Sequence, residues 1–455
     1  MRRPGVLARV PARPTGSPFQ QPSNRFPLLH IRSSALQAAL VLAAASHANA
    51  HAENIVDQLG LGGEFREVFE SSRHPVFGLD RPLDDDRFLH RLTLHSDIRF
   101  GTSGRAYVEL LSGRTSGWGG VPAGTQDDRL DVLQAFGEST FRLDDRPLTL
   151  RVGRQELSLG SSRLVSVREG PNVRRSFDGL RGTWAIDGKT RADVFALRPV
   201  TPRVGSFDDR SSGAEEFWGV YLGNAPTGWQ GLRADLYYLG LDRTNAGFAQ
   251  GRAPERRHTV GARLFGSNGA ADWNFEGAYQ FGSFGTADIR AWTLSSDSGY
   301  TVASLPLSPR FGLKADAISG DRNPTDGRLN TFNALYPKLP YFSEANVAAP
   351  ANLLDLQPNL TLSPRRDLRL NLGWNGLWKQ SRADAFYAPP LTAAANTAGS
   401  ASRYIGQQWL VAAEWTYGPN IALGANYVHF KPGSALRGAG GRAGDFVNVT
   451  MQLKF

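Results

Sequence analysis

The chain has 455 residues, of which 41% are hydrophobic and none is Cys, and its formal net charge is +9 at pH 7. The absence of Cys excludes a disulfide-stabilised scaffold. Residues 1–34 contain six Arg and residues 1–50 contain no acid, so residues 51–455 carry 45 basic residues (51 minus 6) against 42 acidic ones. Their net charge is only +3, which argues against a nucleic-acid-binding protein.

The first 50 residues have the organisation of a secretory signal peptide. A basic segment precedes the apolar stretch "ALQAALVLAAASHANA" (35–50), which ends in an A-x-A motif. The apolar run is roughly 11 residues long, whereas a membrane-spanning helix needs roughly 20, so a transmembrane anchor is the weaker interpretation. We predict cleavage between Ala50 and His51 and export from the cytoplasm.

Further along the chain, apolar and polar residues alternate in segments of roughly ten residues, as in transmembrane β-strands. In "LTLRVGRQ" (148–155) every second residue of the first six is apolar, and "LRLNLGWN" (368–375) and "FVNVTMQLKF" (446–455) follow the same period. The pattern predicts eighteen strands, near 63–71, 88–100, 105–112, 130–143, 148–158, 174–186, 191–198, 216–223, 230–239, 257–266, 271–282, 288–300, 309–319, 353–363, 368–378, 405–417, 421–430 and 445–455.

The connections between these strands alternate in length. Tight-turn sequences occur at 101–104, 144–147, 187–190, 224–228, 266–270, 364–367 and 418–420. Long polar loops are expected at 72–87, 112–129, 158–172, 199–215, 241–256, 320–352, 379–404 and 431–444. A soluble β-sandwich gives no reason for this segregation and rarely has so many strands.

The fold class is therefore predicted to be all-β, a transmembrane antiparallel β-barrel of about 18 strands with short periplasmic turns and long extracellular loops. We expect a short periplasmic segment at 51–61 and one barrel domain at 62–455, in the outer membrane of a Gram-negative bacterium. A barrel of this width leaves an aqueous lumen, which indicates a channel.

If the apolar faces meet lipid, the alternating polar residues face the lumen. Alternation assigns eight basic residues to the lumen: Arg91, Arg99, Arg151, Arg181, Arg233, Arg263, Lys314 and Arg369. It assigns five acids: Asp97, Glu109, Asp235, Glu276 and Asp316. A basic excess in a confined pore favours anions, and guanidinium groups pair well with carboxylates. The alternative is that these charges pair across strands and only stiffen the wall.

The stretch "GRQELSLGSSRLVSVREGPNVRRSFDG" (153–179) concentrates Arg between two strands. It contains the candidate pore-lining residues Arg154, Arg163, Arg168, Arg174 and Arg175, together with the acids Glu156, Glu169 and Asp178. We expect an outer loop that folds into the lumen, with the acids holding the Arg side chains in place. The alternative is a closed salt-bridge brace of Arg154, Glu156, Arg175 and Asp178 that only shapes the loop.

Several stretches carry a resemblance to a known family. They are 84–101, 153–182, 235–243, 258–266, 275–285 and 312–346, of which "GRQEL…RRSFDG" and "SGDRNPTDGRLNTFNAL" are the most specific. Together they resemble the alginate-export outer-membrane porins from about residue 62 to Phe455. The resemblance implies a monomeric eighteen-stranded barrel whose electropositive constriction passes a polyuronate. Export of alginate or a similar acidic polysaccharide is the expected function, and uptake of small anionic nutrients is the alternative.

Other site chemistries have little support. "DRNPTDG" (321–327) has oxygen ligands for Ca²⁺ but lacks the complete EF-hand spacing and its closing Glu, so an Asx-type turn is the better interpretation. No zinc motif surrounds any His. A barrel enzyme would need a Ser beside His90, His95 or His258, and no flanking signature identifies one. We therefore predict no catalytic residue, no metal and no cofactor.

The expected partners follow from the barrel. They are outer-membrane lipid and lipopolysaccharide, the barrel-insertion machinery, an anionic polysaccharide or small anions, and, for export, a periplasmic secretion complex. The terminal strand that ends in Phe455 has the alternation typical of segments read by the insertion machinery.

Overall fold

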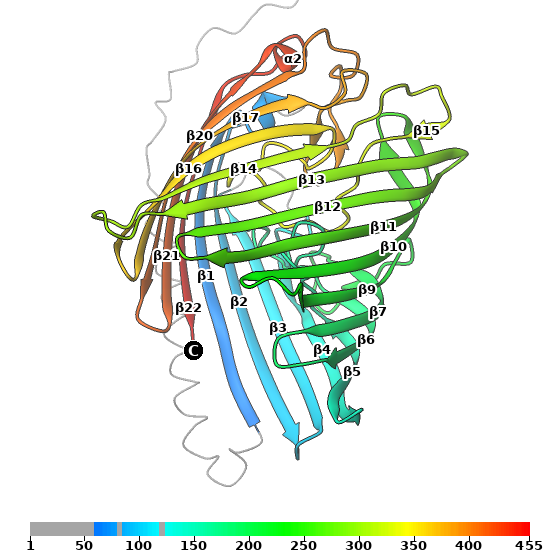
Figure 1. Cartoon of the computed structure of the whole chain (residues 1–455), viewed down its shortest axis with the longest axis vertical. Coiled ribbons are helices and arrows are strands. Elements are labelled where there is room, and N and C mark those ends of the chain that lie inside the picture. Colours follow the sequence, from blue (N-terminus) through cyan, green and yellow to red (C-terminus); the bar gives the residue numbers. More distant parts are fainter. Residues whose placement is uncertain (1–58, 80–83, 118–122) are drawn as a thin grey trace, which may run out of the picture. The chain divides into compact units, whose positions relative to one another are not determined.

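The computed structural model describes residues 59–79, 84–117 and 123–455, so the predicted signal peptide and its cleavage site lie outside the described residues. The described chain forms a closed antiparallel barrel of eighteen long strands (Figure 1). The strands are β1 (Leu59–Arg73), β2 (Asp85–Phe100), β3 (Gly104–Ser116), β4 (Asp128–Leu143), β5 (Arg146–Gln155), β6 (Phe177–Ala185), β7 (Arg191–Thr201), β9 (Glu215–Pro226), β10 (Leu232–Phe248), β11 (Gly251–Asn268), β12 (Ala271–Phe284), β13 (Ala287–Thr301), β14 (Arg310–Ile318), β16 (Leu353–Arg365), β17 (Leu368–Lys379), β20 (Tyr404–Tyr417), β21 (Ile421–Pro432) and β22 (Gly444–Lys454).

The remaining elements are short and belong to the loops. They are the two-residue strands β8 (Arg210–Ser211), β15 (Arg328–Leu329), β18 (Tyr387–Ala388) and β19 (Thr392–Ala393), the 3₁₀ turn η1 (Val76–Gly78) and the helix α2 (Ser434–Arg437). No helix among the described residues is long and apolar enough to cross a membrane.

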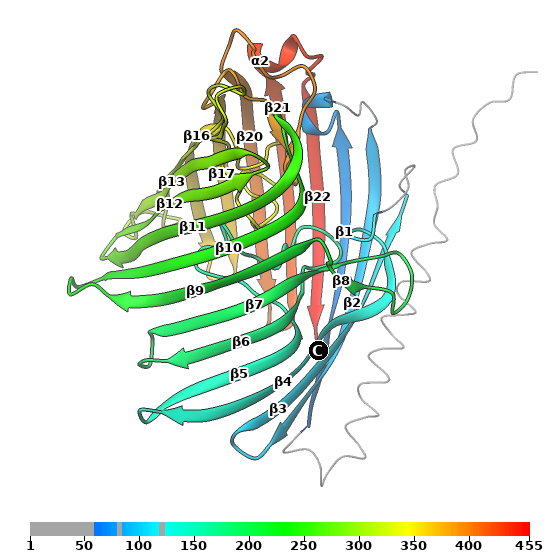
Figure 2. The ribbon, with the colours of Figure 1, turned by 90° about the vertical axis from the view of Figure 1, so that its right-hand side faces the viewer.

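The barrel closes where β1 pairs with β22, and the two strands lie side by side in Figures 1 and 2. The pairing runs from Glu64 opposite Lys454 to Arg73 opposite Asp445. Just before it, the backbone N–H of Gly63 donates to the carbonyl of Phe455 at 2.8 Å, and the N–H of Phe455 donates back at 3.1 Å. A Cβ on Gly63 would lie 2.7 Å from the Phe455 ring, so this closure requires a residue without a side chain.

All eighteen predicted strands are confirmed, but one predicted loop is wrong. Residues 241–256 are not a long loop, because β10 and β11 continue through them to a two-residue turn at 249–250. The polar residues that favoured a loop pair across the two strands instead. Arg243 forms an ion pair with Glu255 at 2.5 Å, and Arg256 forms one with Asp242 at 2.9 Å. Strand β1 also begins at Leu59, three residues before the predicted start of the barrel.

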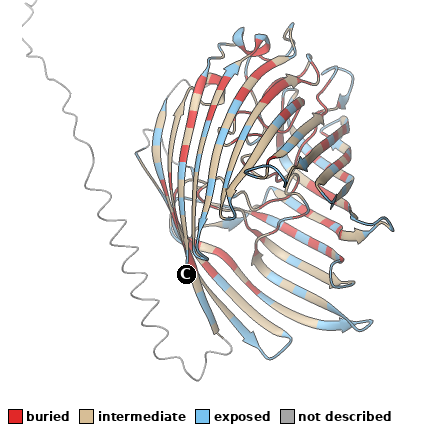
Figure 3. Ribbon diagram, turned by 60° about the vertical axis from the view of Figure 1, so that its left-hand side comes forward, coloured by how far each residue is buried: buried red, intermediate tan, exposed pale blue. Residues whose placement is uncertain are grey.

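Alternation along the strands separates an apolar outer face from a polar inner face. Figure 3 shows how exposure changes from residue to residue along the strands. In β5, Leu150 and Val152 are 45% and 57% exposed, whereas Arg151 between them is half-buried. Exposed apolar residues recur at alternate positions on most strands, including Leu94, Val108, Leu180, Val194, Val220, Leu236, Leu294 and Leu372. Such an apolar surface is stable in contact with lipid, whereas its exposure to water would cost free energy.

The main apolar core lies inside the barrel, where loops pack on the inner face of the strands. The loop between β5 and β6 (residues 156–176, the inward loop) contributes Leu157, Leu164 and Val165 to this core. The loop between β14 and β16 (residues 319–352) contributes Phe332 and Tyr336. The two loops meet in a short parallel bridge, in which Ser166 N–H donates to the Tyr336 carbonyl and Tyr336 N–H donates to the Leu164 carbonyl, each at 2.9 Å.

Candidate functional site

The inward loop reaches from one wall of the barrel to another. On the first wall, Arg66 of β1 donates to the backbone carbonyl of Glu169 at 2.9 Å. Arg91 of β2 is fully buried and donates through the same nitrogen to Glu64 at 2.7 Å and to the Glu169 carboxylate. At the other wall, Ser161 donates to Glu276 of β12 at 2.6 Å. The loop is thus tied to strands far apart around the barrel, so that it narrows the lumen.

The base of the inward loop is held by charge pairs. Arg154 makes a two-pronged contact with Asp178, with nitrogen–oxygen distances of 2.9 and 3.2 Å. Arg174 lies 2.7 Å from Glu156 and 3.5 Å from Glu109 of β3. The structure therefore brings Arg154 to Asp178 and Arg174 to Glu156, and does not join these residues in one closed set with Arg175.

The environment of Glu156 makes its charge sensitive to pH. Burial raises the pKa of this carboxyl group to about 7, the negative charges of Glu109 and Glu169 add to the rise, and Arg174 opposes it. The carboxyl group of Glu156 therefore gains or loses its charge near neutral pH.

Arg168 and Arg175 differ from their neighbours because neither forms an ion pair with any described residue. Arg175 lies over the ring of Tyr336, 4.7 Å from its centre. Nε of Arg168 and one terminal nitrogen of Arg175 are buried without a hydrogen-bond partner among the described residues. The backbone of Arg168 is left-handed, with φ of 59°, an uncommon conformation for a side-chain-bearing residue that is often found at functional sites.

Both arginines remain charged at neutral pH. Burial, with the nearby charge of Arg175, lowers the pKa of Arg168 to about 9. Burial lowers the pKa of Arg175 to about 10, against the opposing influence of Tyr336 and Glu215. The two groups are therefore desolvated cations without a counterion in the described chain.

The same two arginines line a cavity of about 590 Å³ between the inward loop, the β10–β11 hairpin and the loops that follow β14 and β17. Its charged lining residues are Arg168, Arg175, Arg243, Arg252 and Glu215. Glu215 accepts a hydrogen bond from the Tyr336 hydroxyl at 3.0 Å, and Arg243 is paired with Glu255. Four cations against one acid make this cavity a candidate anion site.

Most of the charges assigned to the barrel wall by alternation form ion pairs. The pairs across strands include Arg151 with Glu138 at 2.6 Å, Arg181 with Asp193 at 2.7 Å, Arg263 with Asp235 at 2.9 Å and Arg105 with Asp97 at 2.7 Å, and Arg163 of the inward loop pairs with Glu276 at 3.5 Å. Arg99 lies 3.7 Å from Asp97. Such pairs neutralise one another, so they contribute less to the field in the lumen than their number indicates.

The other predicted wall residues have different surroundings. Arg233 donates to the side chain of Asn224 at 3.1 Å. Lys314 and Arg369 form no ion pair with any described residue. Asp316 lies opposite Asp355 in the pairing of β14 with β16.

Four residues of the site were not predicted from the sequence: Arg66, Arg243, Arg252 and Tyr336. The alternation of β1 places Arg66 on the same face as Glu64, so a strict two-residue period would have found it. Arg243 and Arg252 fell in the wrongly predicted loop, and no local pattern distinguishes Tyr336.

The segment "DRNPTDG" contains turns of the expected kind. The side-chain oxygen of Asn323 accepts the N–H of Thr325 at 3.2 Å, and that of Asp326 accepts the N–H of Arg328 at 3.0 Å.

We expect anion selectivity to rise as the pH falls from about 8 to about 6, because protonation of Glu156 removes one negative charge beside Arg174. The sign follows from the raised pKa of about 7: the carboxyl is charged above it and neutral below it. Reversal potentials at both pH values measure the effect. The Glu156→Gln variant should have, at both pH values, the selectivity that the wild-type protein has at low pH. If the selectivity of this variant changed with pH as much as that of the wild-type protein, another group would be responsible for the effect.

The comparisons with known proteins agree with this architecture. The sequence pattern of the alginate-export family matches residues 57–450. A comparison with curated protein sequences finds no match.

Solved outer-membrane porins have a similar fold. OccAB1 of Acinetobacter baumannii is 13% identical, with a TM-score of 0.58 over 89% of this chain and 98% of that one. OccK8 (OprE) of Pseudomonas aeruginosa is 11% identical, with a TM-score of 0.56 over 88% and 99%. OpdK of the same organism, solved with vanillate, is 10% identical, with a TM-score of 0.56 over 88% and 99%. These structures share the barrel fold of this chain, and the match over residues 57–450 shows that the chain belongs to the alginate-export family of outer-membrane β-barrels.

Proposed function

We propose that this outer-membrane channel passes anionic solutes, and that its substrate is an acidic polysaccharide such as alginate, moving outward. The proposal rests on one observation. Arg168 and Arg175 are buried at the lumen-crossing loops without an acidic partner, and they line a cavity whose charged groups are four arginines and one glutamate.

A passing carboxylate would supply the counterion that these guanidinium groups lack. Guanidinium and carboxylate groups form two parallel hydrogen bonds, and the low dielectric of a narrow lumen strengthens the attraction. Conduction also requires release, and here the negative charge of Glu215 in the cavity lining limits the strength of binding. A polyuronate presents a carboxylate on every sugar, so it can exchange one group for the next at a fixed basic site.

Uptake of small anions is the second candidate, and one observation favours it. The loops fill much of the long-loop end of the barrel, and the cavity of about 590 Å³ has the size of a small-ligand site. OpdK, which shares this fold, was solved with vanillate, a small carboxylate. Export of a polymer would in addition require a periplasmic secretion complex that delivers the chain to the short-turn end.

Reversal potentials in planar bilayers under a salt gradient test the proposal. We expect anion selectivity, and a decrease in ion current when oligouronates are added on the short-turn side. Uncharged oligosaccharides of the same length are the control. Block by monomeric carboxylates but not by oligouronates would favour uptake of small anions. Cation selectivity, or the same current with and without both ligands, would refute an anion channel.

A further inference from the structure

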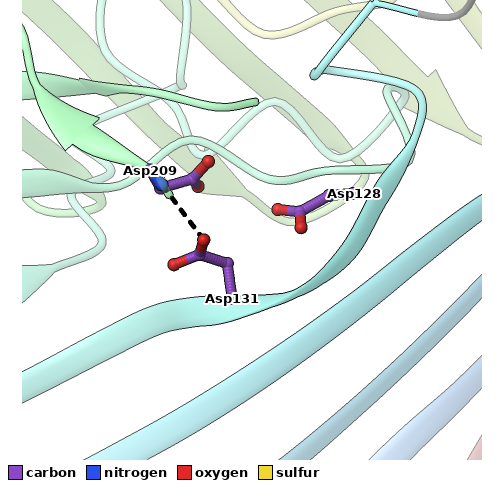
Figure 4. Close-up of side chains that lie close together, drawn as sticks. All are labelled: Asp128, Asp131 and Asp209. Atoms are coloured by element: carbon purple, nitrogen blue, oxygen red, sulfur yellow. Dashed lines mark hydrogen bonds between the residues drawn. The ribbon is translucent and has the colours of Figure 1, made fainter. Parts of the chain in front are cut away.

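Three aspartates converge at the long-loop end of the barrel (Figure 4). They line a small cavity that shares Arg168 and Arg175 with the proposed anion site. Asp128 and Asp131 lie at the start of β4, and Asp209 lies in the loop between β7 and β9. One carboxylate oxygen from each lies within 4.8 Å of the others. Because about 2.4 Å separates Ca²⁺ from each of its ligands, two oxygens on opposite sides of one Ca²⁺ are about 4.8 Å apart.

Backbone contacts fix this arrangement. Residues 202–209 dock along the start of β4, where Arg129 N–H donates to the Gly205 carbonyl at 3.1 Å and Phe207 N–H donates to the Leu130 carbonyl at 3.0 Å. The second carboxylate oxygen of Asp131 accepts the N–H groups of Asp208 and Asp209, at 2.7 and 3.0 Å. The three carboxylates are therefore held together by the fold itself.

Asp128 is the observation that points to a ligand. Its side chain is only 1% exposed, and its Oδ1 has no hydrogen-bond partner among the described residues. In Figure 4 its carboxylate faces those of Asp131 and Asp209. A buried carboxylate beside two others, with no partner, is among the least stable arrangements in a protein interior unless a bound cation or a proton compensates its charge.

The nearby arginines do not supply that cation in the described chain. Arg154 approaches Asp131 at 3.8 Å, but its two-pronged contact is with Asp178. Arg168, Arg174 and Arg175 share with the three aspartates a cavity of about 60 Å³, yet none of them forms an ion pair with Asp128. Their charges weaken cation binding, so we expect an affinity like that of extracellular calcium modules, roughly 10⁻⁴ to 10⁻³ M.

We propose that Asp128, Asp131 and Asp209 bind a hard divalent cation, Ca²⁺ in preference to Mg²⁺, which fastens residues 202–209 to β4. Carboxylate oxygens are the ligands of hard cations, and the spread of these three suits the longer bonds of Ca²⁺ better than the bonds of about 2.1 Å that Mg²⁺ requires. The adjoining cavity has room for the water ligands that complete the coordination.

The cation would act on the base of the inward loop. The backbone carbonyl of Asp209 accepts a hydrogen bond of 3.5 Å from Arg154, and Ser211 donates to Asp178. Arg154 and Asp178 are the ion pair that holds the start of β6 against the end of β5. Fastening residues 202–209 would therefore stabilise the strand ends from which the inward loop emerges.

Calcium titration of the refolded, lipopolysaccharide-free protein in detergent tests this site by calorimetry. We expect one site per chain, with at least tenfold weaker binding in the Asp128→Asn and Asp209→Asn variants. The matched control is Asp145→Asn, which changes a fully exposed carboxylate in a short turn. No binding to the wild-type protein at 10 mM Ca²⁺, or equal binding by the wild-type and Asp128→Asn proteins, would overturn the proposal.

Thermal unfolding separates cation binding from a purely structural role. In EDTA, Asp128→Asn should unfold at or above the wild-type temperature, because it removes a buried carboxyl group that has no hydrogen-bond partner among the described residues. With Ca²⁺, only the wild-type and Asp145→Asn proteins should gain stability and should be protected from chymotrypsin at Phe207, which is 60% exposed. A lower unfolding temperature for Asp128→Asn in EDTA would assign Asp128 a structural role and refute the site.

Discussion

Replacing Arg168 and Arg175 together by Ala should remove most of the anion selectivity of the channel. If each guanidinium stabilises a passing anion by roughly 1 kcal/mol, the loss of both lowers the anion-to-cation permeability ratio by roughly 30-fold at low salt, and by less as salt screens the charges. Neither residue forms an ion pair with a described residue, so little of the fold depends on their charge. Reversal potentials at two salt gradients measure the ratio.

The matched control removes the same charge at the other end of the barrel. Arg142 and Arg146 lie in or beside the short turn between β4 and β5, where both are exposed. Their double Ala variant should retain the wild-type selectivity to within a factor of about two, because screening limits the reach of an exposed charge. Equal losses in both variants would mean that net charge, and not the cavity, determines selectivity.

Replacing Arg91 by Met should widen the pore and destabilise the barrel. The buried guanidinium holds Glu64 of β1 and Glu169 at the tip of the inward loop. Its removal leaves Glu64 without an ion pair to any described residue and Glu169 with only the 3.8 Å approach of Arg174. Breaking a buried ion pair such as Arg91 with Glu64 costs roughly 3–5 kcal/mol. The carboxylate of Glu169 loses its contact with the β2 wall, while its backbone contact with Arg66 and the hydrogen bond from Gly170 N–H to the Leu339 carbonyl remain. We expect a higher and noisier single-channel conductance and a lower unfolding temperature.

A second variant separates the two effects. In Arg91→Met/Glu64→Gln/Glu169→Gln the buried charges are gone, so the unfolding temperature should recover while the conductance stays high. Arg99→Met, which removes a largely exposed arginine from the same strand, is the control and should change neither. Wild-type conductance in both Arg91 variants would show that the loop tip does not depend on this contact.

The strands could be predicted because lipid imposes a simple rule on each of them. Residues such as Leu150 and Val152 must be apolar on one face, and this constraint is local, so a two-residue period reveals it. Where the strands extend beyond the membrane, their outer face no longer has to be apolar. In β10 and β11 the ends are held by ion pairs such as Arg243 with Glu255, and their polar sequence was mistaken for a loop.

The candidate site could be predicted only in part, because partners decide the role of each arginine. The sequence placed Arg154 and Arg168 in one Arg-rich stretch and gave no reason to separate them. The difference arises from distant residues: Asp178 pairs with Arg154, whereas nothing in the described chain pairs with Arg168. Asp128 and Asp209 are likewise 81 positions apart and meet only through the docking of the β7–β9 loop on β4.

The pairing of β1 with β22 determines the order in which the protein can be built. Glu64 and Gln452, which are bonded across this seam, are 388 positions apart, and closing a loop of that length costs roughly 5 kcal/mol of chain entropy. Until the two strands pair, each is an open edge with a row of free N–H and C=O groups that can capture a neighbouring chain. A nascent barrel therefore needs its edges shielded until β1 and β22 pair, and an assembly factor that pairs temporarily with one of them would meet that need.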